Sequence, residues 1–214
     1  MRSFRTSARV LATAVALVCG AAPAGAASYT ESTDGDLSGD RNAPTTLVLD
    51  YAPSGNVQGS NIVSGTTGRN AVTGVVDVDY LRITVPDGFA LSALRVGNQT
   101  TVGGGGSFLG LAAGPVMPVA PNAANATGLL GYRVYGTRDI GTDILDDMAA
   151  GGNGASGFTQ PLGAGVYTVW VQELATGTFD YRFNFVLSPV PEPGGAPLLA
   201  AGLLIITVAA RRRS

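Results

Sequence analysis

The chain lacks most of the side chains on which catalytic and metal sites depend. It contains no histidine and no lysine, and its single cysteine, Cys19, lies close to the start. Without histidine and lysine, Ser-His-Asp triads, Cys-His pairs, Schiff-base lysines and Ser-Lys pairs are excluded. Zinc sites built on histidine and cysteine are excluded as well. Carboxylate chemistry remains, either as an acid and base pair of the glycosidase type or as a calcium site with oxygen ligands.

The first 27 residues have the layout of a secretory signal peptide. Three arginines precede an apolar run over Val10–Val18, and the small residues Ala24-Gly25-Ala26 form a cleavage site. We expect export through the Sec machinery and cleavage after Ala26 or Ala27. Cys19 would leave with this segment as a passive apolar residue, or alternatively serve as a lipoprotein acylation site.

The predicted mature body, residues 28–189, is acidic and free of thiols. From Ser28 to Val190 there are seven arginines and fourteen acidic residues, so the net charge is about −7. Such a charge disfavours a nucleic-acid partner, because phosphate binding needs a basic surface. An exported domain without disulfides must be stabilised by packing or by metal ions bound through oxygen. The length suits one domain.

Apolar residues alternate with polar ones along the body, and turn residues separate the runs, which predicts strands with one buried face. The expected strands are Thr46–Tyr51, Tyr80–Val85, Leu91–Asn98, Phe108–Ala112, Leu130–Tyr135, Val166–Leu174 and Phe179–Leu187. One short helix is expected around Thr142–Ala150. Many short strands joined by Gly- and Asn-rich turns predict an all-β fold, an antiparallel β-sandwich or jelly roll.

Two groups of acidic residues are candidates for a metal site. Asp34, Asp36, Ser38 and Asp40 stand at alternate positions, and Asp77 and Asp79 lie just before the second expected strand. In an extended segment alternate carboxylates share a face, and they repel one another unless a cation or an arginine neutralises them. Calcium is the natural cation for a secreted protein without thiols. Alternatively, these are turn and strand-edge aspartates exposed to water.

Trp170 is the only tryptophan, and it is expected on the face opposite Tyr167 and Val169. If that face is open, Trp170 with Gln172 and Glu173 could stack on a sugar of an extracellular polysaccharide. If it faces other protein, Trp170 is a core residue, the commoner fate of a large aromatic side chain.

The C-terminal segment 190–214 combines three features in a fixed order. Pro191, Glu192 and Pro193 precede the uncharged run Ala196–Ala210, which is followed by Arg211, Arg212 and Arg213. As a transmembrane helix this run would span roughly 22 Å, and the arginines would stay in the cytoplasm. A plain anchor explains the helix and the arginines. It does not explain the proline-rich triplet.

This order closely resembles the PEP-CTERM sorting signal of exported bacterial proteins. The resemblance implies that a membrane-embedded exosortase recognises Pro191, Glu192 and Pro193, that residues 196–210 hold the membrane, and that Arg211–Arg213 act as a stop. It also implies removal of the tail after an inner-membrane intermediate, with the product at the cell surface or outside the cell. The prolines would keep the triplet extended for a protease.

The body has a resemblance of its own. The stretches "DGDLSGD", "VSGTTG", "DVDYLRITVPDGFALSALRV" and "PLGAGVYTVWVQE" look like an ectodomain type found in PEP-CTERM proteins. Asp77–Val96 is also similar to the bacterial pre-peptidase C-terminal domain, a β-sandwich that binds calcium in some members. That likeness implies Asp77 and Asp79 as ligands, with Glu31, Asp34 and Asp36 beside them, and no catalytic residue.

These features together predict a non-enzymatic exported protein of the cell surface or extracellular matrix, with a structural or adhesive body. A carbohydrate-binding module or a carboxylate-only glycosidase on the same export signal is the alternative. A third alternative keeps the tail uncleaved as a plain membrane anchor.

Overall fold

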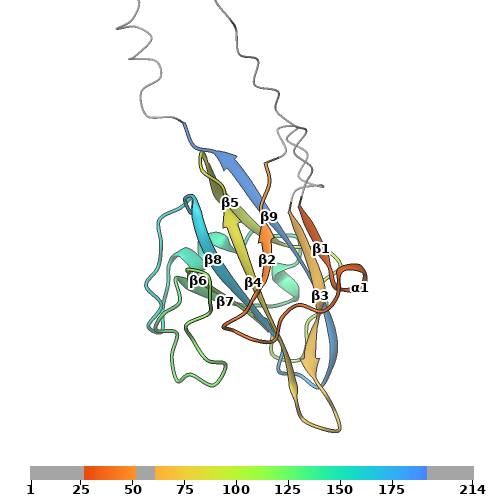
Figure 1. Cartoon of the computed structure of the whole chain (residues 1–214). Coiled ribbons are helices and arrows are strands. Elements are labelled where there is room, and N and C mark those ends of the chain that lie inside the picture. Colours follow the sequence, from red (N-terminus) through yellow and green to blue (C-terminus); the bar gives the residue numbers. More distant parts are fainter. Residues whose placement is uncertain (1–26, 52–60, 192–214) are drawn as a thin grey trace, which may run out of the picture.

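The computed structural model describes residues 27–51 and 61–191, which form a mostly antiparallel all-β fold with little helix (Figure 1). The strands are β1 Ser28–Thr30, β2 Thr45–Val48, β3 Ile62–Arg69, β4 Val76–Val85, β5 Phe89–Val96, β6 Ser107–Ala113, β7 Gly131–Tyr135, β8 Gly165–Gln172 and β9 Gly177–Pro189. The helices are the short α1 Glu31–Asp34 and α2 Leu145–Ala149, with a 3-10 turn, η1, at Thr137–Asp139. The predicted all-β class is therefore confirmed.

The strands pair in the order β5-β9-β3-β4-β8-β6-β7, with β1 parallel to β3 and β2 parallel to β4. Strands β3 and β4 pair with each other only at the end of β3 and the start of β4, where Gly68 pairs with Asp77 and Arg69 with Val76. Along most of its length β3 instead pairs with β9, and β4 pairs with β8. The pairing thus divides into one group of β1, β3, β5 and β9 and another of β2, β4, β6, β7 and β8.

One hydrophobic core receives side chains from both strand groups. Leu81, Ile83 and Val85 of β4 enter it, as predicted from their alternation, and so do Phe183 and Phe185 of β9. Burial of these large apolar side chains removes them from water and is the main favourable contribution to folding. A second, smaller cluster lies around Trp170 and Tyr80, on the side of β4 and β8 away from this core.

Most of the expected elements are found close to their expected bounds. The seven predicted strands correspond to β2, β4, β5, β6, β7, β8 and β9, and the predicted helix corresponds to α2. Strand β8 differs in one respect, because all its side chains from Tyr167 to Gln172 are buried. Tyr167, Val169 and Val171 face the main core, while Trp170 belongs to the second cluster.

Two local features were not expected from the sequence. Strand β3 contains the turn-like residues Ser-Gly-Thr-Thr-Gly, yet it pairs with β9 over seven positions from Ile62 to Gly68. The start of the acidic segment is also not extended, since Glu31–Asp34 form the helical turn α1.

Most of the predicted signal peptide and sorting tail lies outside the described residues. The signal peptide up to Ala26, Glu192, Pro193, the helix 196–210 and Arg211–Arg213 all lie outside them; of the triplet only Pro191 is described. Among residues 27–51 and 61–191, no helix has the length and apolar character needed to span a membrane.

Candidate functional sites

Three carboxyl groups from two distant parts of the chain meet in the structure. Glu31 of α1, Asp36 and Asp79 of β4 each bring an oxygen within 4.8 Å of the others. Parallel pairing of β1 with β3 places α1 beside β3, where the Glu31 carboxylate accepts hydrogen bonds from Thr66 N (2.8 Å) and Leu37 N (3.2 Å). We call Glu31, Asp36 and Asp79 the acidic cluster.

Gly65 of β3 makes room for this arrangement. A Cβ atom at Gly65 would overlap both the Glu31 carboxyl group and the hydroxyl group of Tyr181. Tyr181 lies opposite Gly65 in the β3–β9 ladder, so its ring crosses the place that a larger side chain would occupy. The absence of a side chain at position 65 therefore lets β9 contribute to the cluster.

Asp79 is the most constrained member of the cluster. Its side chain is buried, with 1% of the residue exposed, and its Oδ2 accepts a hydrogen bond from Tyr181 Oη at 2.8 Å. Its Oδ1 is buried without a hydrogen-bond partner in the described part of the chain. The same Tyr181 hydroxyl lies 3.3 Å from Glu31 Oε1. Because a phenol has one proton, it satisfies only one of the two carboxylates at a time.

The electrostatics follow from this burial. Removal from water and the neighbouring Glu31 raise the pKa of Asp79 to about 9, even though the Tyr181 hydrogen bond favours the charged form. Burial and the charges of Asp79 and Glu31 likewise raise the pKa of Tyr181. Arg133 makes the only salt bridges within the described stretches, to Asp139 and Asp147. No arginine there pairs with the acidic cluster.

The predicted metal residues divide into three cases. Asp36 and Asp79 belong to the acidic cluster. Asp77 stands two residues before Asp79 on β4, and burial together with the charges of Asp36 and Glu31 raises its pKa, but its oxygens are not among the three that meet. Asp34 turns away, because its carboxylate accepts a hydrogen bond from Thr30 N at 2.8 Å. The expectation that alternate acids share one extended face therefore fails at α1.

Calcium binds about six to eight oxygen ligands, so three carboxyl groups would supply part of its coordination and water the rest. A cleft of about 620 Å³ reaches Glu31 and Asp36 of the cluster, though not Asp79, and is also lined by Tyr181, Gln99 and Arg182, among others. The cleft gives an ion and its water ligands a route from solvent. Without a cation, burial and the nearby Glu31 favour a proton on Asp79, as the raised pKa of Asp79 indicates.

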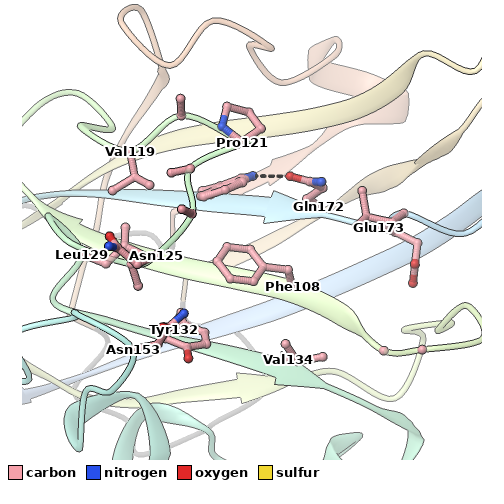
Figure 2. A pocket seen from close by; sticks show the side chains of 18 of the residues that line it. Phe108, Val119, Pro121, Asn125, Leu129, Tyr132, Val134, Asn153, Gln172 and Glu173 are labelled. Carbon is pink, nitrogen blue, oxygen red and sulfur yellow. Dashed lines mark hydrogen bonds between the residues drawn. The ribbon is translucent and has the colours of Figure 1, made fainter.

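A second hollow lies over the outer face of β6, β7 and β8 (Figure 2). Trp170 is at its floor with 6% of the residue exposed, and its indole N–H donates to Gln172 Oε1 at 3.1 Å. Phe108 and Tyr132, both half-buried, stack beside it. Trp170 is thus mainly a packing residue, and the accessible rings are the two that the sequence did not single out.

Sequence reasoning missed Gly65, Tyr181, Phe108 and Tyr132. One signal was available for Tyr181, which is the only hydroxyl-bearing ring in the inward series of β9 and therefore requires a partner when buried. The other three owe their roles to contacts between strands distant in the sequence, which spacing along one strand does not reveal.

Comparisons with protein-family models, with curated proteins and with solved structures find no match for this chain.

Proposed function

We propose that the protein is an exported bacterial protein of the cell surface or extracellular matrix, sorted and cleaved at its PEP-CTERM tail by an exosortase. Its body is a non-catalytic β-sandwich with a structural or adhesive role. The order of the triplet, the uncharged run and the arginine cluster supports the sorting step. The shared core between the two strand groups supports the sandwich, because each group buries one face against the other.

The observation that carries the sorting proposal is the position of the last described strand, just before the triplet. Strand β9 ends at Pro189, and the last backbone contact before the triplet is the hydrogen bond from Val190 N to Gly88 O at 2.8 Å. Cleavage at or after Pro191–Pro193 would therefore leave every described core residue in place. At the other end, Ala27 already accepts a bond from Ile62 N, and β1 begins at Ser28, next to the expected signal-peptide cleavage point.

Mass spectrometry of the protein recovered from the outside of its host tests this proposal. We expect a product that lacks both the first 26 or 27 residues and Ser214. Replacing Pro191, Glu192 and Pro193 together by alanine should leave the tail attached, whereas the same change at the exposed acids Asp146 and Asp147 should not. Recovery of an intact Ser214 in the final product would overturn the sorting proposal and favour a plain anchor.

We further propose that the body binds calcium at the acidic cluster. The carrying observation is Asp79, a carboxyl group that is 1% exposed, has one oxygen without a partner and faces two further acids. Glu31, Asp36 and Asp79 would each supply an oxygen, and the ion would offset the repulsion between them. A glycosidase role for the same acids is less well supported, because a sugar cannot reach a carboxyl group buried beneath Tyr181.

Calorimetric titration of calcium, with thermal melting in calcium and in chelator, tests the metal site. We expect saturable binding and stabilisation of about 2.7 kcal/mol at a calcium concentration of 100 Kd. Asp79→Asn and Asp36→Asn should abolish both effects, and the exposed Asp87→Asn should preserve them. Absence of heat and of any melting shift in the unaltered protein would overturn the calcium proposal while leaving the sorting proposal intact.

A further inference from the structure

The hollow over β6, β7 and β8 has the size and lining of a small-molecule site. Its volume is about 720 Å³, within the range of about 300 to 1,000 Å³ typical of ligand pockets. One wall comes from the segment Val119–Ala126, which crosses the outer face of the sheet, and the other from Gly104–Gly106 with Leu174. We call this hollow the aromatic groove.

The floor of the aromatic groove offers flat rings. The centroids of Phe108 and Tyr132 lie 5.8 Å apart with their planes 21° from parallel, so the two rings stack as one pair, which we call the ring platform. Trp170 contacts Phe108 at a centroid distance of 4.5 Å and supports the platform. Such ring faces attract the polarised C–H groups of a ligand laid flat on them.

Gln172 is a buried polar side chain that lines this groove, with 7% of the residue exposed. Its Oε1 accepts the Trp170 indole N–H, as Figure 2 shows, and this bond fixes the orientation of the amide. Its Nε2 makes no hydrogen bond to any other described residue. This nitrogen is not fully enclosed, so its N–H groups can donate to water or to a ligand in the groove.

The groove carries no free charge. Glu173 is the only lining residue of a type that is charged at neutral pH. Both its oxygens are occupied: Oε2 accepts from Gly103 N at 2.9 Å and Ser107 Oγ at 2.7 Å, and Oε1 accepts from Ala175 N at 2.8 Å. The remaining polar side chains are the amides of Asn125 and Asn153, which Figure 2 shows around the rings. A complementary partner is therefore uncharged, with apolar faces and hydroxyl groups at its edges.

We propose that the aromatic groove binds a neutral oligosaccharide, with a sugar ring stacked on Phe108 and Tyr132 and a hydroxyl group accepting from Gln172 Nε2. Pyranose rings combine C–H faces with equatorial hydroxyl groups, which matches a ring platform bordered by amides. This inference deepens the proposed adhesive role and rests on it, by naming a ligand class for the body. It is independent of the acidic cluster, which is built from other strands.

The sole tryptophan makes the test direct, because Trp170 lies at the floor of the groove and reports binding through its own fluorescence. The full-length chain, held in a detergent without a sugar headgroup, is titrated with cellohexaose, xylohexaose, mannohexaose and maltohexaose, and with polygalacturonate as the charged comparison. We expect a saturable change with at least one neutral hexaose and none with polygalacturonate.

Variants then assign the site. Tyr132→Ala should weaken binding about tenfold and Gln172→Met about fivefold, consistent with the loss of one ring contact and one hydrogen bond. Val166→Ala is the matched control, since Val166 is a partly exposed apolar residue of β8 that does not line the groove; its affinity should be unchanged. Thermal melting of each variant establishes that it is folded, and Tyr132→Phe, which keeps the ring, should retain most of the affinity.

Three results would overturn the proposal. The first is no fluorescence change with any of the four hexaoses at millimolar concentration. The second is binding that Tyr132→Ala and Gln172→Met leave unaltered. The third is binding of the apolar dye anilinonaphthalene sulfonate that Tyr132→Ala abolishes but no hexaose displaces, which would assign the groove to an apolar partner. None of these bears on cleavage of the tail, which is measured by mass, so the two proposals fail separately.

Discussion

Two carboxylic acids are buried to nearly the same extent in this protein, Glu173 at 2% exposure and Asp79 at 1%, but their surroundings are opposite. Glu173 accepts hydrogen bonds on both oxygens from Gly103, Ser107 and Ala175; burial raises its pKa, but these donors outweigh it and the pKa is lowered. Asp79 has one donor, Tyr181, and an acidic neighbour, Glu31, and its pKa is raised. The difference shows that hydrogen-bond donors and neighbouring charges decide whether a buried carboxyl group stays ionised. It also distinguishes Glu173, an anion whose oxygens are satisfied by the protein, from Asp79, a carboxyl group that favours its protonated form.

The largest expected effect is on the pH dependence of stability without calcium. The folded protein holds the Asp79 proton up to a pKa of about 9, whereas the unfolded chain releases it near the ordinary value of 3.8. Between these values the folded state binds more protons, so the free energy of unfolding should fall by several kcal/mol as the pH rises from about 4 to 9. Urea unfolding in chelator at a series of pH values measures it.

Asp79→Asn should remove most of this slope, because asparagine does not titrate. Glu173 acts in the opposite sense: its lowered pKa stabilises the fold above its ordinary value of 4.5, and that contribution is lost on acidification below it. Saturating calcium should flatten the slope for the unaltered protein. A slope that persists in Asp79→Asn would mean that another group carries it.

The second prediction tests this difference directly. Each acid is replaced by its amide, and the stability of the fold is measured in chelator at neutral pH. Glu173→Gln should destabilise the fold by about 3 kcal/mol, because it sets an amide N–H₂ group against N–H and O–H donors that required an acceptor. Asp79→Asn should cost nothing or should stabilise, since asparagine is already neutral and spares the folded protein the proton that Asp79 must take up at neutral pH. Chemical denaturation gives both values, and Asp87→Asn, at an exposed turn, should change stability by less than about 0.5 kcal/mol.

Equal losses for Glu173→Gln and Asp79→Asn would contradict the distinction between the two sites. Such a result would mean that Asp79, like Glu173, is an anion fully satisfied by the protein itself.

The fold was more predictable from the sequence than the sites were. Strand β9 is easy to predict, because its apolar side chains alternate with mostly polar ones, as burial of one face requires. The alternating residues are Tyr181, Phe183, Phe185 and Leu187. Strand β3 is harder to predict, because Ser64, Gly65 and Gly68 interrupt its strand-favouring Ile, Val and Thr residues. Its conformation is set by pairing with β9, more than a hundred residues away.

The same physical limit applies to the acidic cluster. Asp36 and Asp79 could be proposed together because carboxylates are conspicuous in a body with few other ionisable groups. The position of Gly65 opposite Tyr181, and the turn α1 that carries Glu31 toward them while turning Asp34 away, depend on long-range register. In the aromatic groove, the position of Trp170 on the face opposite Tyr167 was predictable from alternation. The segment Val119–Ala126, which crosses that face, was not predictable.

The third prediction sharpens the comparison from the backbone side. Gly65→Ala should lower stability by about 2 kcal/mol and weaken calcium binding, because the added Cβ atom collides with the Glu31 carboxyl group and the Tyr181 hydroxyl group. Gly163→Ala is the matched control, since a Cβ atom there meets nothing within 4 Å. Thermal melting with and without calcium separates the two, and identical behaviour of both variants would show that Gly65 has no part in shaping the cluster.

The smallest expected effect concerns the one donor that Asp79 has. Tyr181→Phe removes the hydroxyl group that bonds Asp79 Oδ2 at 2.8 Å, so in chelator it should cost about 1 kcal/mol and raise the pKa of Asp79 further. Tyr167→Phe is its control, because that buried tyrosine also loses one hydrogen bond, from its hydroxyl group to Gly163 O at 2.8 Å. If calcium replaces the missing donor at Asp79, adding it should reduce the cost of Tyr181→Phe and leave that of Tyr167→Phe unchanged. Equal costs in calcium and in chelator for both variants would mean that the ion does not reach Asp79, and that the proton alone stabilises this carboxyl group.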